Sequence, residues 1–432
     1  MLTSVIICAV CVLLMIASIL FFPKLRIKKL NISTYWVVAL VGAVVLLAVK
    51  NEHVAAVGQA MTAHTAINPL KILVLFISMT VLSIFLDELG FFRFLASCIL
   101  KRAKTGQTKL FIYLYITVSV LTMFTSNDII ILSFTPFICY FAKNAKIDPI
   151  PFLAAEFVAA NTWSMALIIG NPTNIYLATA SGIDFIGYIK VSILPTLAAG
   201  IVAFLMLFLL FHKKLRAPIS GEPEAIVIKD KLLLWVGIAH LAVCTVLLAI
   251  GSYIGAEMWL ISASAVGSLV IFNCVIAIVR RRKPSELFGC IRRIPYELVP
   301  FLLSMFAMIV ILSEDGVTAQ IANLLGSDLA VLKYGTASFL SANIINNIPM
   351  SVLFSSIIEA SPTAGTGAIY ATIIGSNISA FFTPIGALAG IMWSSILSEH
   401  GYKFSYLNFL IMGLVIAVPT LFAALGVLCL IV

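Results

Sequence analysis

The sequence predicts an all-α, polytopic membrane protein made of two inverted repeats, and three observations predict this fold class. Of the 432 residues, 62% are hydrophobic and only 10% are charged, whereas soluble globular domains carry about 25% charged residues. Apolar runs long enough to cross a bilayer recur along the whole chain. A polar island containing a proline interrupts an apolar segment in each half, at 170–174 and 375–386. Paired interruptions of this kind indicate a transporter with internal repeats.

The first half is expected to cross the membrane five times. The first apolar run, 1–22, is too long for a signal-peptide core and lacks a basic n-region, so we expect it to be retained as a span. The segment 86–102 begins with two acids, ends in two basic residues and is apolar on one face, which is typical of a helix lying in the membrane interface. The predicted crossings are 2–22, 33–49, 70–86, a broken helix at 149–182, and 185–211.

Two shorter apolar pieces, 110–124 and 129–142, meet at a polar tip that reads Thr-Ser-Asn-Asp. At about 1.5 Å per residue each piece is about 20 Å long, which is too short for a hydrocarbon core about 30 Å thick. We therefore expect a re-entrant helical hairpin whose tip lies near the membrane midplane. A second pair of short apolar pieces meets at 343–349 and predicts a second hairpin.

The same order of elements starts again after residue 231. The predicted crossings are 232–250, 258–279, 297–312, a second broken helix at 365–398, and 404–431. The motif L-S-E-D-G at 312–316 echoes L-D-E-L-G at 86–90. We therefore predict a first repeat at 1–211, a hydrophilic cytoplasmic linker at 212–231 and a second repeat at 232–432.

The distribution of basic residues predicts the topology. Five crossings per repeat is an odd number, so the two repeats must be inverted. One set of alternate loops then collects 23 of the 27 lysines and arginines, and the positive-inside rule makes that side cytoplasmic, with both termini outside. The net charge of +9 is thereby explained by topology, and nucleic-acid binding is not expected.

The two hairpin tips and two helix breaks are expected to converge on one solute site. Helix N-termini there offer N–H groups to an anionic or oxygen-rich solute, and free carbonyls can hold a cation. The alternative is that these residues only form turns and kinks between helices. The candidate substrate-binding residues are Ser126, Asn127, Asn171, Thr173, Asn174, Asn346, Asn347, Ser376, Asn377 and Thr383.

Two acids are predicted to couple transport to an ion. Asp128 lies at the first tip and Glu156 in the first broken helix, and an intramembrane carboxylate indicates a proton or sodium relay. The alternative for Glu156 is contact with cytoplasmic water near the start of its helix. No lysine or arginine is expected at the site. No enzyme motif is present, and we expect no cofactor and no metal site, because the eight cysteines are scattered.

Several motifs together resemble the bacterial arsenite efflux pump family of the ion-transporter superfamily, which also contains divalent-anion/sodium symporters. They are F-L-D-E-L-G-F-F-R-F at 85–94, T-S-N-D at 125–128, G-N-P-T-N at 170–174, N-N-I-P at 346–349 and T-P-I-G-A-L-A at 383–389. The resemblance implies an inverted-repeat fold whose hairpin tips bind solute and cation. It also leaves open a homodimer with elevator-like motion and a peripheral ATPase subunit. The uncharged segment 376–382 departs from the family's pattern of an acid and a lysine there.

The leading hypothesis is a secondary transporter in a bacterial plasma membrane that exports a small oxyanion or its neutral hydroxide, such as arsenite or antimonite, in exchange for protons. Arsenite suits a site without cations because its dominant form at neutral pH is uncharged. The alternative is a sodium- or proton-coupled symporter for di- or tricarboxylates with the same fold. A channel would ignore ion gradients. A membrane sensor would need a soluble signalling domain. The expected partners are the solute and the lipid bilayer.

Overall fold

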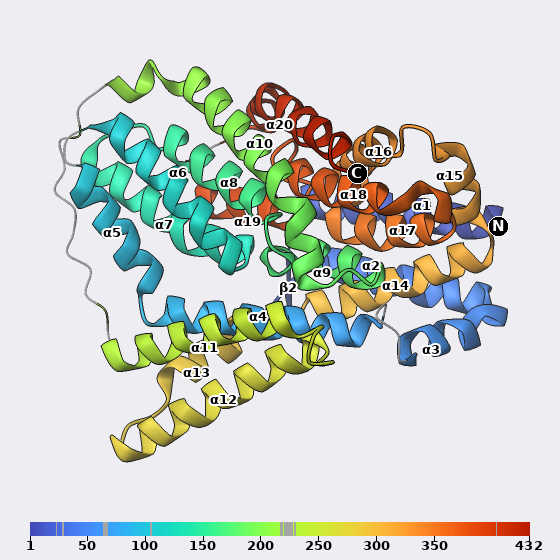
Figure 1. The fold of residues 1–432 in the computed structure, drawn as a ribbon, viewed down its shortest axis with the longest axis horizontal. Helices are drawn as coiled ribbons and strands as arrows, with labels where there is room; N and C mark the ends of the chain where they lie inside the picture. Colours follow the sequence, from blue (N-terminus) through green and yellow to red (C-terminus); the bar gives the residue numbers. More distant parts are fainter. Residues whose placement is uncertain are drawn as a thin grey trace.

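A computed structural model describes residues 1–22, 24–27, 30–63, 68–103, 106–216, 219, 228, 230–402 and 404–432. The chain is almost entirely helical (Figure 1). Within the described residues, eight helices are long and apolar enough to cross a membrane, or nine if one pair bent by 98° counts as a single span. The prediction of a polytopic helical membrane protein is confirmed.

The first half runs from a pair of apolar helices to a long helix that ends near residue 211. Its elements are α1 (Leu2–Phe21), β1 (Lys24–Ile27), β2 (Leu30–Ser33), α2 (Thr34–Val49), η1 (Asn51–His53), α3 (Val54–Thr62), α4 (Pro69–Glu88), α5 (Phe91–Ala103), α6 (Gln107–Phe124), α7 (Asn127–Ala145), α8 (Ile150–Trp163), η2 (Ile168–Gly170), α9 (Pro172–Ala180), α10 (Phe185–Phe211) and η3 (Lys214–Arg216). The two short strands pair antiparallel in a hairpin that joins α1 to α2.

The second half has the same order of helices without the strands. Its elements are α11 (Lys231–Ile250), α12 (Met258–Val279), α13 (Ser285–Arg293), α14 (Leu298–Glu314), α15 (Val317–Leu325), α16 (Ala330–Ile345), α17 (Asn347–Glu359), η4 (Pro362–Ala364), α18 (Gly365–Ser379), α19 (Leu388–Glu399) and α20 (Tyr406–Cys429). The repeat boundaries and the inverted orientation of the halves stay predictions. Most of the predicted linker, including 220–227, lies outside the described residues.

Three boundaries differ from the sequence predictions. Asp87 and Glu88 close α4 instead of opening the interfacial helix, which begins only at Phe91. The arms α6 and α7 are 18 and 19 residues long, so the length argument for a re-entrant hairpin fails for these arms. The polar residues at the start of α6 and at the end of α7 continue the helices beyond the apolar pieces.

The helix breaks are also displaced from the predicted islands. The first break covers 164–171, and Pro172 is the first residue of α9. Proline suits that position because its missing N–H would have no partner in the first turn of a helix. The second break covers 380–387, so Ser376 and Asn377 belong to the last turn of α18.

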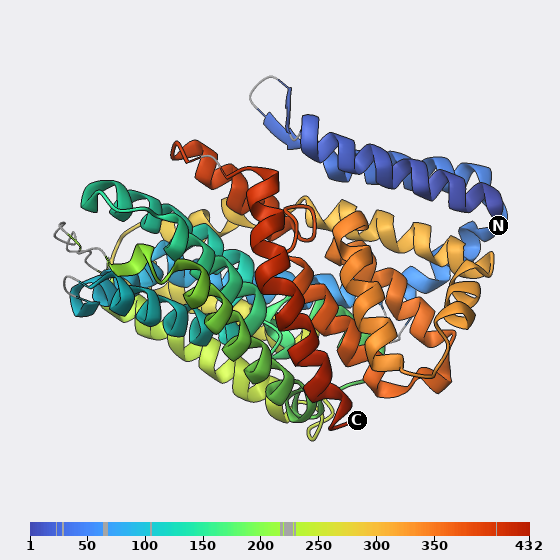
Figure 2. The same ribbon diagram turned by 90° about the horizontal axis from the view of Figure 1, so that it is seen from above.

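The two halves pack into each other. Helix α2 packs against α14 and α12 packs against α4, so the first helices of each half contact the other half. The pair α1–α2 lies along one flank (Figure 2), and α12 lies at another edge (Figure 1). These flanking helices expose large apolar side chains, which suits contact with lipid. Helices α8, α9 and α18 are almost completely buried and position the candidate site.

Ion pairs stabilise the contacts between the two halves at the ends of α4 and α14. At the end of α4, the Arg293 guanidinium of α13 lies 2.7 Å from a carboxylate oxygen of Asp87 and 2.9 Å from one of Glu88. At the end of α14, a carboxylate oxygen of Asp315 lies 3.1 Å from Lys50 Nζ and 3.2 Å from His53 Nε2. The acids of the two echoed motifs therefore bind basic residues of the opposite half.

Candidate functional site

Each broken helix stops at a serine whose hydroxyl turns back onto the helix. Ser164 Oγ donates to the Asn161 carbonyl at 2.9 Å, and Ser379 Oγ donates to the Ser376 carbonyl at 2.7 Å. Both hydroxyls bond three residues back, so they satisfy a carbonyl that the interrupted helix would leave without a partner. The two breaks therefore share one local device.

Each break also passes a glycine closely against the carbonyl that ends the preceding helix. A Cβ atom on Gly170 would lie 2.2 Å from the Ser164 carbonyl oxygen, and a Cβ on Gly386 would lie 2.2 Å from that of Ser379. Only a residue without a side chain allows this approach. The glycines in G-N-P and T-P-I-G are thus required by packing at the break.

After the first break, Asn171 caps the N-terminus of α9. Its Oδ1 accepts hydrogen bonds from Thr173 N at 3.1 Å and from Thr173 Oγ1 at 3.0 Å. Asn174 Nδ2, within α9, reaches back to the Ser164 carbonyl at 2.8 Å. The short polar side chains of the G-N-P-T-N motif therefore form hydrogen bonds within the break.

Asn377 joins this first break to the second half. Its Oδ1 accepts from Asn171 Nδ2 at 3.0 Å and lies 2.9 Å from Ser164 Oγ, whose single proton it shares with the Asn161 carbonyl. Its Nδ2 donates to Asn174 Oδ1 at 2.7 Å and to the Ile373 carbonyl at 2.8 Å. All four hydrogen-bonding positions of this buried amide are used, so in this conformation Asn377 links α18 to α9.

The first hairpin tip joins the same network. Ser126 is the N-cap of α7, and Asn127, its first residue, donates from Nδ2 to Asn161 Oδ1 at 2.9 Å. Asp128 follows in the first turn of α7, and its carboxyl group forms no hydrogen bond or ion pair with any residue in the described part of the chain. A network of hydrogen bonds thus runs from the first tip through the first break to α18.

The second hairpin tip binds the second break. Asn346 is the N-cap of α17 and has a φ of +72° and a ψ of +152°, a strained backbone conformation that glycine adopts far more readily than any other residue. Its Nδ2 donates to the Ile385 carbonyl at 3.0 Å, and the backbone N–H of Asn347 donates to the Gly386 carbonyl at 3.1 Å. The second tip and the second break are therefore held together by backbone carbonyls.

Thr383 ties the first arm of this hairpin to the same break. Its Oγ1 donates to Asn343 Oδ1 at 2.7 Å, and Asn343 Nδ2 donates to the Phe339 carbonyl at 2.8 Å. Thr383, Asn346 and Asn347 thus form a second cluster beside the one built around Asn377.

Glu156 lies apart from both clusters and has no exposed surface. Thr135 Oγ1 lies 3.2 Å from each carboxyl oxygen. The Trp393 indole N–H, from α19, lies close to the same carboxyl group without reaching hydrogen-bond geometry. Its ring packs on Phe157 at a centroid distance of 5.0 Å. The alternative that Glu156 reaches cytoplasmic water does not hold in this conformation.

Several buried oxygen atoms near the breaks and tips have unused hydrogen-bonding capacity. Among the described residues, no hydrogen-bond partner is found for the buried oxygens Ser126 Oγ, Asn127 Oδ1, Thr162 Oγ1 and Ser376 Oγ. Buried polar atoms are normally bonded to protein, water or a ligand. Hydroxyl and amide oxygens of this kind can accept a hydrogen bond from a hydroxylated solute or coordinate a cation.

Sequence reasoning missed several members of these clusters. Asn161, Ser164, Asn343 and Thr135 bond directly to predicted site residues. Ser164 could have been found, because a serine lies six residues before the glycine of the first break and another lies seven before the glycine of the second. Thr135 belongs to the T-P pair at 135–136 that accompanies the T-S-N-D motif, but only the packing of α7 on α8 brings it to Glu156.

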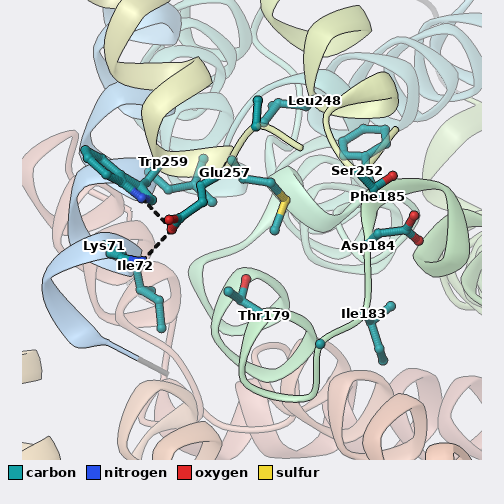
Figure 3. Close-up of a pocket in the computed structure, with 14 residues that line it drawn as sticks. Lys71, Ile72, Thr179, Ile183, Asp184, Phe185, Leu248, Ser252, Glu257 and Trp259 are labelled. Carbon is teal, nitrogen blue, oxygen red and sulfur yellow. Dashed lines mark hydrogen bonds and ion pairs between the residues drawn. The ribbon is translucent and has the colours of Figure 1, made fainter. Parts of the chain in front are cut away.

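A cavity of about 230 Å³ lies at the far end of α9, away from the break. Figure 3 shows Lys71, Glu257 and Trp259 on one wall, Asp184 on the opposite wall and Thr179 between them. Glu257 Oε2 lies 2.5 Å from Lys71 Nζ and accepts a hydrogen bond from Trp259 Nε1 at 2.7 Å. None of the predicted site residues lines this cavity.

Comparison with known proteins supports a transporter. The arsenical pump membrane protein of Escherichia coli (strain K12) is 27% identical over 374 residues, which cover 82% of this chain and 85% of that protein. The putative arsenical pump membrane protein of Bacillus subtilis (strain 168) is 23% identical and covers 84% of this chain and 87% of its own length. The resemblance to arsenite efflux pumps that the motifs suggested is confirmed.

A solved structure shares the fold. The YdaH transporter of Alcanivorax borkumensis, whose crystal structure reveals an unusual topology, superposes with a TM-score of 0.55 at 13% identity over 99% of this chain and 97% of that one. At this identity the likeness concerns the fold alone. The sequence profile of the citrate transporter family CitMHS matches residues 27–373. The chain therefore belongs to the CitMHS citrate transporter family and is a multi-pass membrane transporter.

Proposed function

We propose that this protein is a secondary transporter that exports a small oxyanion or its neutral hydroxide, of the arsenite or antimonite type, in exchange for protons. The observation that carries the proposal is the charge of the buried polar residues. Among the residues described, the buried polar and charged side chains include asparagines, serines, threonines and three acids, but no lysine, arginine or histidine.

This charge pattern favours a neutral solute. Moving an anion out of water costs several kcal/mol unless a cation or several hydrogen-bond donors replace its hydration. A tricarboxylate would bring about three such charges into a region that offers only amides, hydroxyls and helix N-termini. A neutral hydroxide offers O–H groups instead, and these suit acceptors such as Ser126 Oγ, Asn127 Oδ1 and Ser376 Oγ. The names of the relatives, which are arsenical pump membrane proteins, support the same class of solute.

Proton coupling is assigned to the two acids. Asp128 stands in the first turn of α7 beside the tip, and Glu156 is fully buried beside the Thr135 hydroxyl and the Trp393 indole. A carboxyl group inside a membrane protein without a cationic partner is a proton or cation carrier by default. In the proposed cycle these carboxyl groups take up protons from outside and release them inside as the solute leaves.

The alternative is a carboxylate symporter driven by sodium or protons. One observation favours it, because the family to which the chain belongs is described as citrate transporters. The N-termini of α7, α9 and α17 at the tips and the first break could bind carboxylate groups through backbone N–H dipoles, and the free oxygens could hold Na⁺.

Transport by the purified protein in liposomes separates the two. With arsenite outside and the liposome lumen made acidic, we expect arsenite uptake that is driven by the outward proton gradient. This uptake should not require sodium. Strict sodium dependence with citrate or succinate as the solute would overturn the proposal. A thermal-shift screen with arsenite, antimonite, citrate, succinate, sulfate and sodium provides an independent measure of binding.

Asp128→Asn tests the coupling role. The amide keeps the shape of the side chain but cannot release a proton, so proton-driven transport should be lost while the protein stays folded. Glu314→Gln, which removes an exposed acid at the end of α14, is the control and should transport normally. Unchanged transport by Asp128→Asn would remove Asp128 from the mechanism.

A further inference from the structure

A second cavity, of about 350 Å³, lies between α5, α7 and the end of α19. It is formed by both halves, because α5 and α7 belong to the first half and His400 follows α19 in the second. In Figure 1, α5 and α7 lie at the end of the molecule opposite the N-terminus and α15. The ends of α5 and α7, at Ala103 and Ala145, lie in the segments 87–109 and 143–148, which are predicted to be cytoplasmic.

The cavity follows one face of α7 toward the first hairpin tip. Leu132, Pro136, Tyr140 and Asn144 line it and are spaced by four residues, so they share one face of the helix. Asp128 lies one turn before Leu132, the lining residue nearest the tip. At about 1.5 Å per residue, the stretch from Leu132 to Asn144 is about 18 Å long. The cavity thus reaches from the end of α7 to within one turn of the predicted coupling residue.

The polar side chains around the cavity suit a small oxyanion. Arg93 of α5 lines it, and its guanidinium forms no ion pair or hydrogen bond with a residue in the described ranges. No aspartate or glutamate is among its lining residues. Tyr140 and Asn144 add neutral polar groups. An arginine with all its donors available and no acid beside it binds oxyanions well, because its planar N–H groups match carboxylate and phosphate oxygens.

His400 favours an oxyanion that still carries an O–H group. Its Nδ1 lies 2.9 Å from the Ile396 carbonyl oxygen, and a carbonyl only accepts, so Nδ1 carries the proton. In the neutral imidazole, Nε2 is then an acceptor. It can accept a hydrogen bond from an O–H group on the same ligand whose charged oxygen binds Arg93. Glu399, the neighbouring acid, does not line the cavity.

We propose that this cavity is a cytoplasmic binding site for a partly protonated oxyanion, with Arg93 as the ligand of the charged oxygen and His400 as the acceptor of its O–H group. The assignment to the cytoplasmic side rests on the topology predicted from the basic residues, which the proposed function shares. The binding itself does not depend on it. It adds a cationic loading site at the surface to a buried site that has no cation. The same oxyanion chemistry could come from a soluble solute or from a lipid phosphate.

Calorimetry with the full-length protein in nanodiscs of neutral lipid tests the site. The probes are inorganic phosphate, which carries an O–H at neutral pH, and sulfate, which does not. We expect phosphate to bind more tightly than sulfate. R93Q should weaken phosphate binding by about tenfold or more, since a hydrogen bond to a charged group contributes about 1.5–3 kcal/mol. R102Q changes an exposed arginine of α5 outside the cavity and should bind phosphate as the wild type does.

A second experiment distinguishes a soluble oxyanion from a lipid phosphate as the ligand. Nanodiscs with phosphatidylglycerol show whether a lipid headgroup occupies the cavity, because a headgroup would be retained by the wild type and lost from R93Q. Phosphate binding or lipid retention that depends on Arg93 supports an oxyanion site. Equal behaviour of wild type and R93Q in both experiments overturns it. Arsenite transport by R93Q at saturating solute is measured separately, so the failure of this site and the failure of the proposed function remain distinguishable.

Discussion

At the scale of single residues, the buried asparagines differ in how many of their side-chain hydrogen-bonding groups have partners. All hydrogen-bonding groups of the Asn377 side chain have partners within the protein. The side-chain oxygen of Asn127, Oδ1, has no partner among the residues described. An amide whose groups are all used holds helices together. An amide with a free oxygen can still meet a solute or a cation, which makes Asn127 and Ser126 the stronger candidates for binding.

Asn377→Ala should therefore destabilise the protein. The change removes the hydrogen bonds to Ser164, Asn171 and Asn174 and leaves their buried polar groups without that partner. Hydrogen bonds between membrane helices contribute about 0.6 kcal/mol each, so we expect a loss of about 2 kcal/mol in the free energy of unfolding. Reversible unfolding in mixed micelles measures it. Asn323→Ala, at an exposed position of α15, is the matched control, and equal stability of the two variants would contradict this role.

The glycines at the breaks give a second prediction at this scale. Gly386→Ala would place a Cβ 2.2 Å from the Ser379 carbonyl oxygen and 2.8 Å from Asn343 Oδ1. The break has to move, so we expect a destabilisation of about 1–3 kcal/mol and transport reduced by about tenfold or more. The same assays apply to Gly267→Ala in α12, where nothing lies within 4 Å of the new Cβ. Transport by Gly386→Ala at the rate of Gly267→Ala would show that the break tolerates the shift.

At the scale of elements, the ends of α4 and α14 show why two echoed acidic motifs occur. Each motif places acids at the end of a helix that the opposite half covers, and each finds its basic partner there. Asp87 is buried beside Arg293, so its charge needs that partner. These ion pairs connect the flanking helices of one half to the core of the other.

The cluster at Asp315 predicts a pH dependence. The Ser4 hydroxyl, together with Lys50, His53 and the N-terminal amine, holds the pKa of Asp315 well below its usual range. A lowered pKa contributes stability above the usual value of 3.8, and this contribution is lost as the pH falls through the lower, folded-state pKa. Asp315→Asn should thus reduce stability near neutral pH by roughly 1 kcal/mol or less, because these charges are partly screened by water.

Thermal unfolding between pH 3 and pH 8 measures this effect. The difference between wild type and Asp315→Asn should be present at about pH 5 and shrink as the pH falls toward about 3. High salt should also reduce it. Asp328→Asn, at an exposed site paired with Lys333, is the comparison variant and should show little difference. A stability difference that grows between about pH 5 and pH 3 would contradict the role of Asp315.

At the scale of the whole molecule, the two tips and two breaks lie inside a shell of apolar helices. Ser126 is 5% exposed and Asn346 is 1% exposed. Single cysteines at these positions, in a chain whose native cysteines are replaced by serine, should react slowly with a hydrophilic maleimide in membranes. A cysteine at Thr363, which is exposed within η4, should react quickly. Rapid labelling of both tips from opposite faces would contradict a shared buried site.

The sequence by itself determined the class of the protein and the order of its helices. Hydrophobic length and composition decide whether a segment enters a membrane, and both are local properties of the chain. The motifs also marked the tips and breaks, since proline, glycine and asparagine impose local backbone geometry.

Only the tertiary structure decided which polar groups meet. The bond between Asn377 and Asn174, the contact of Thr135 with Glu156 and the pairing of Asp87 with Arg293 all join residues distant in the chain. Such contacts depend on how helices pack, and the spacing of residues along the chain does not determine helix packing. The sequence placed the breaks near their prolines, whereas the close approach of each glycine to a carbonyl six or seven residues before it fixed where each helix stops.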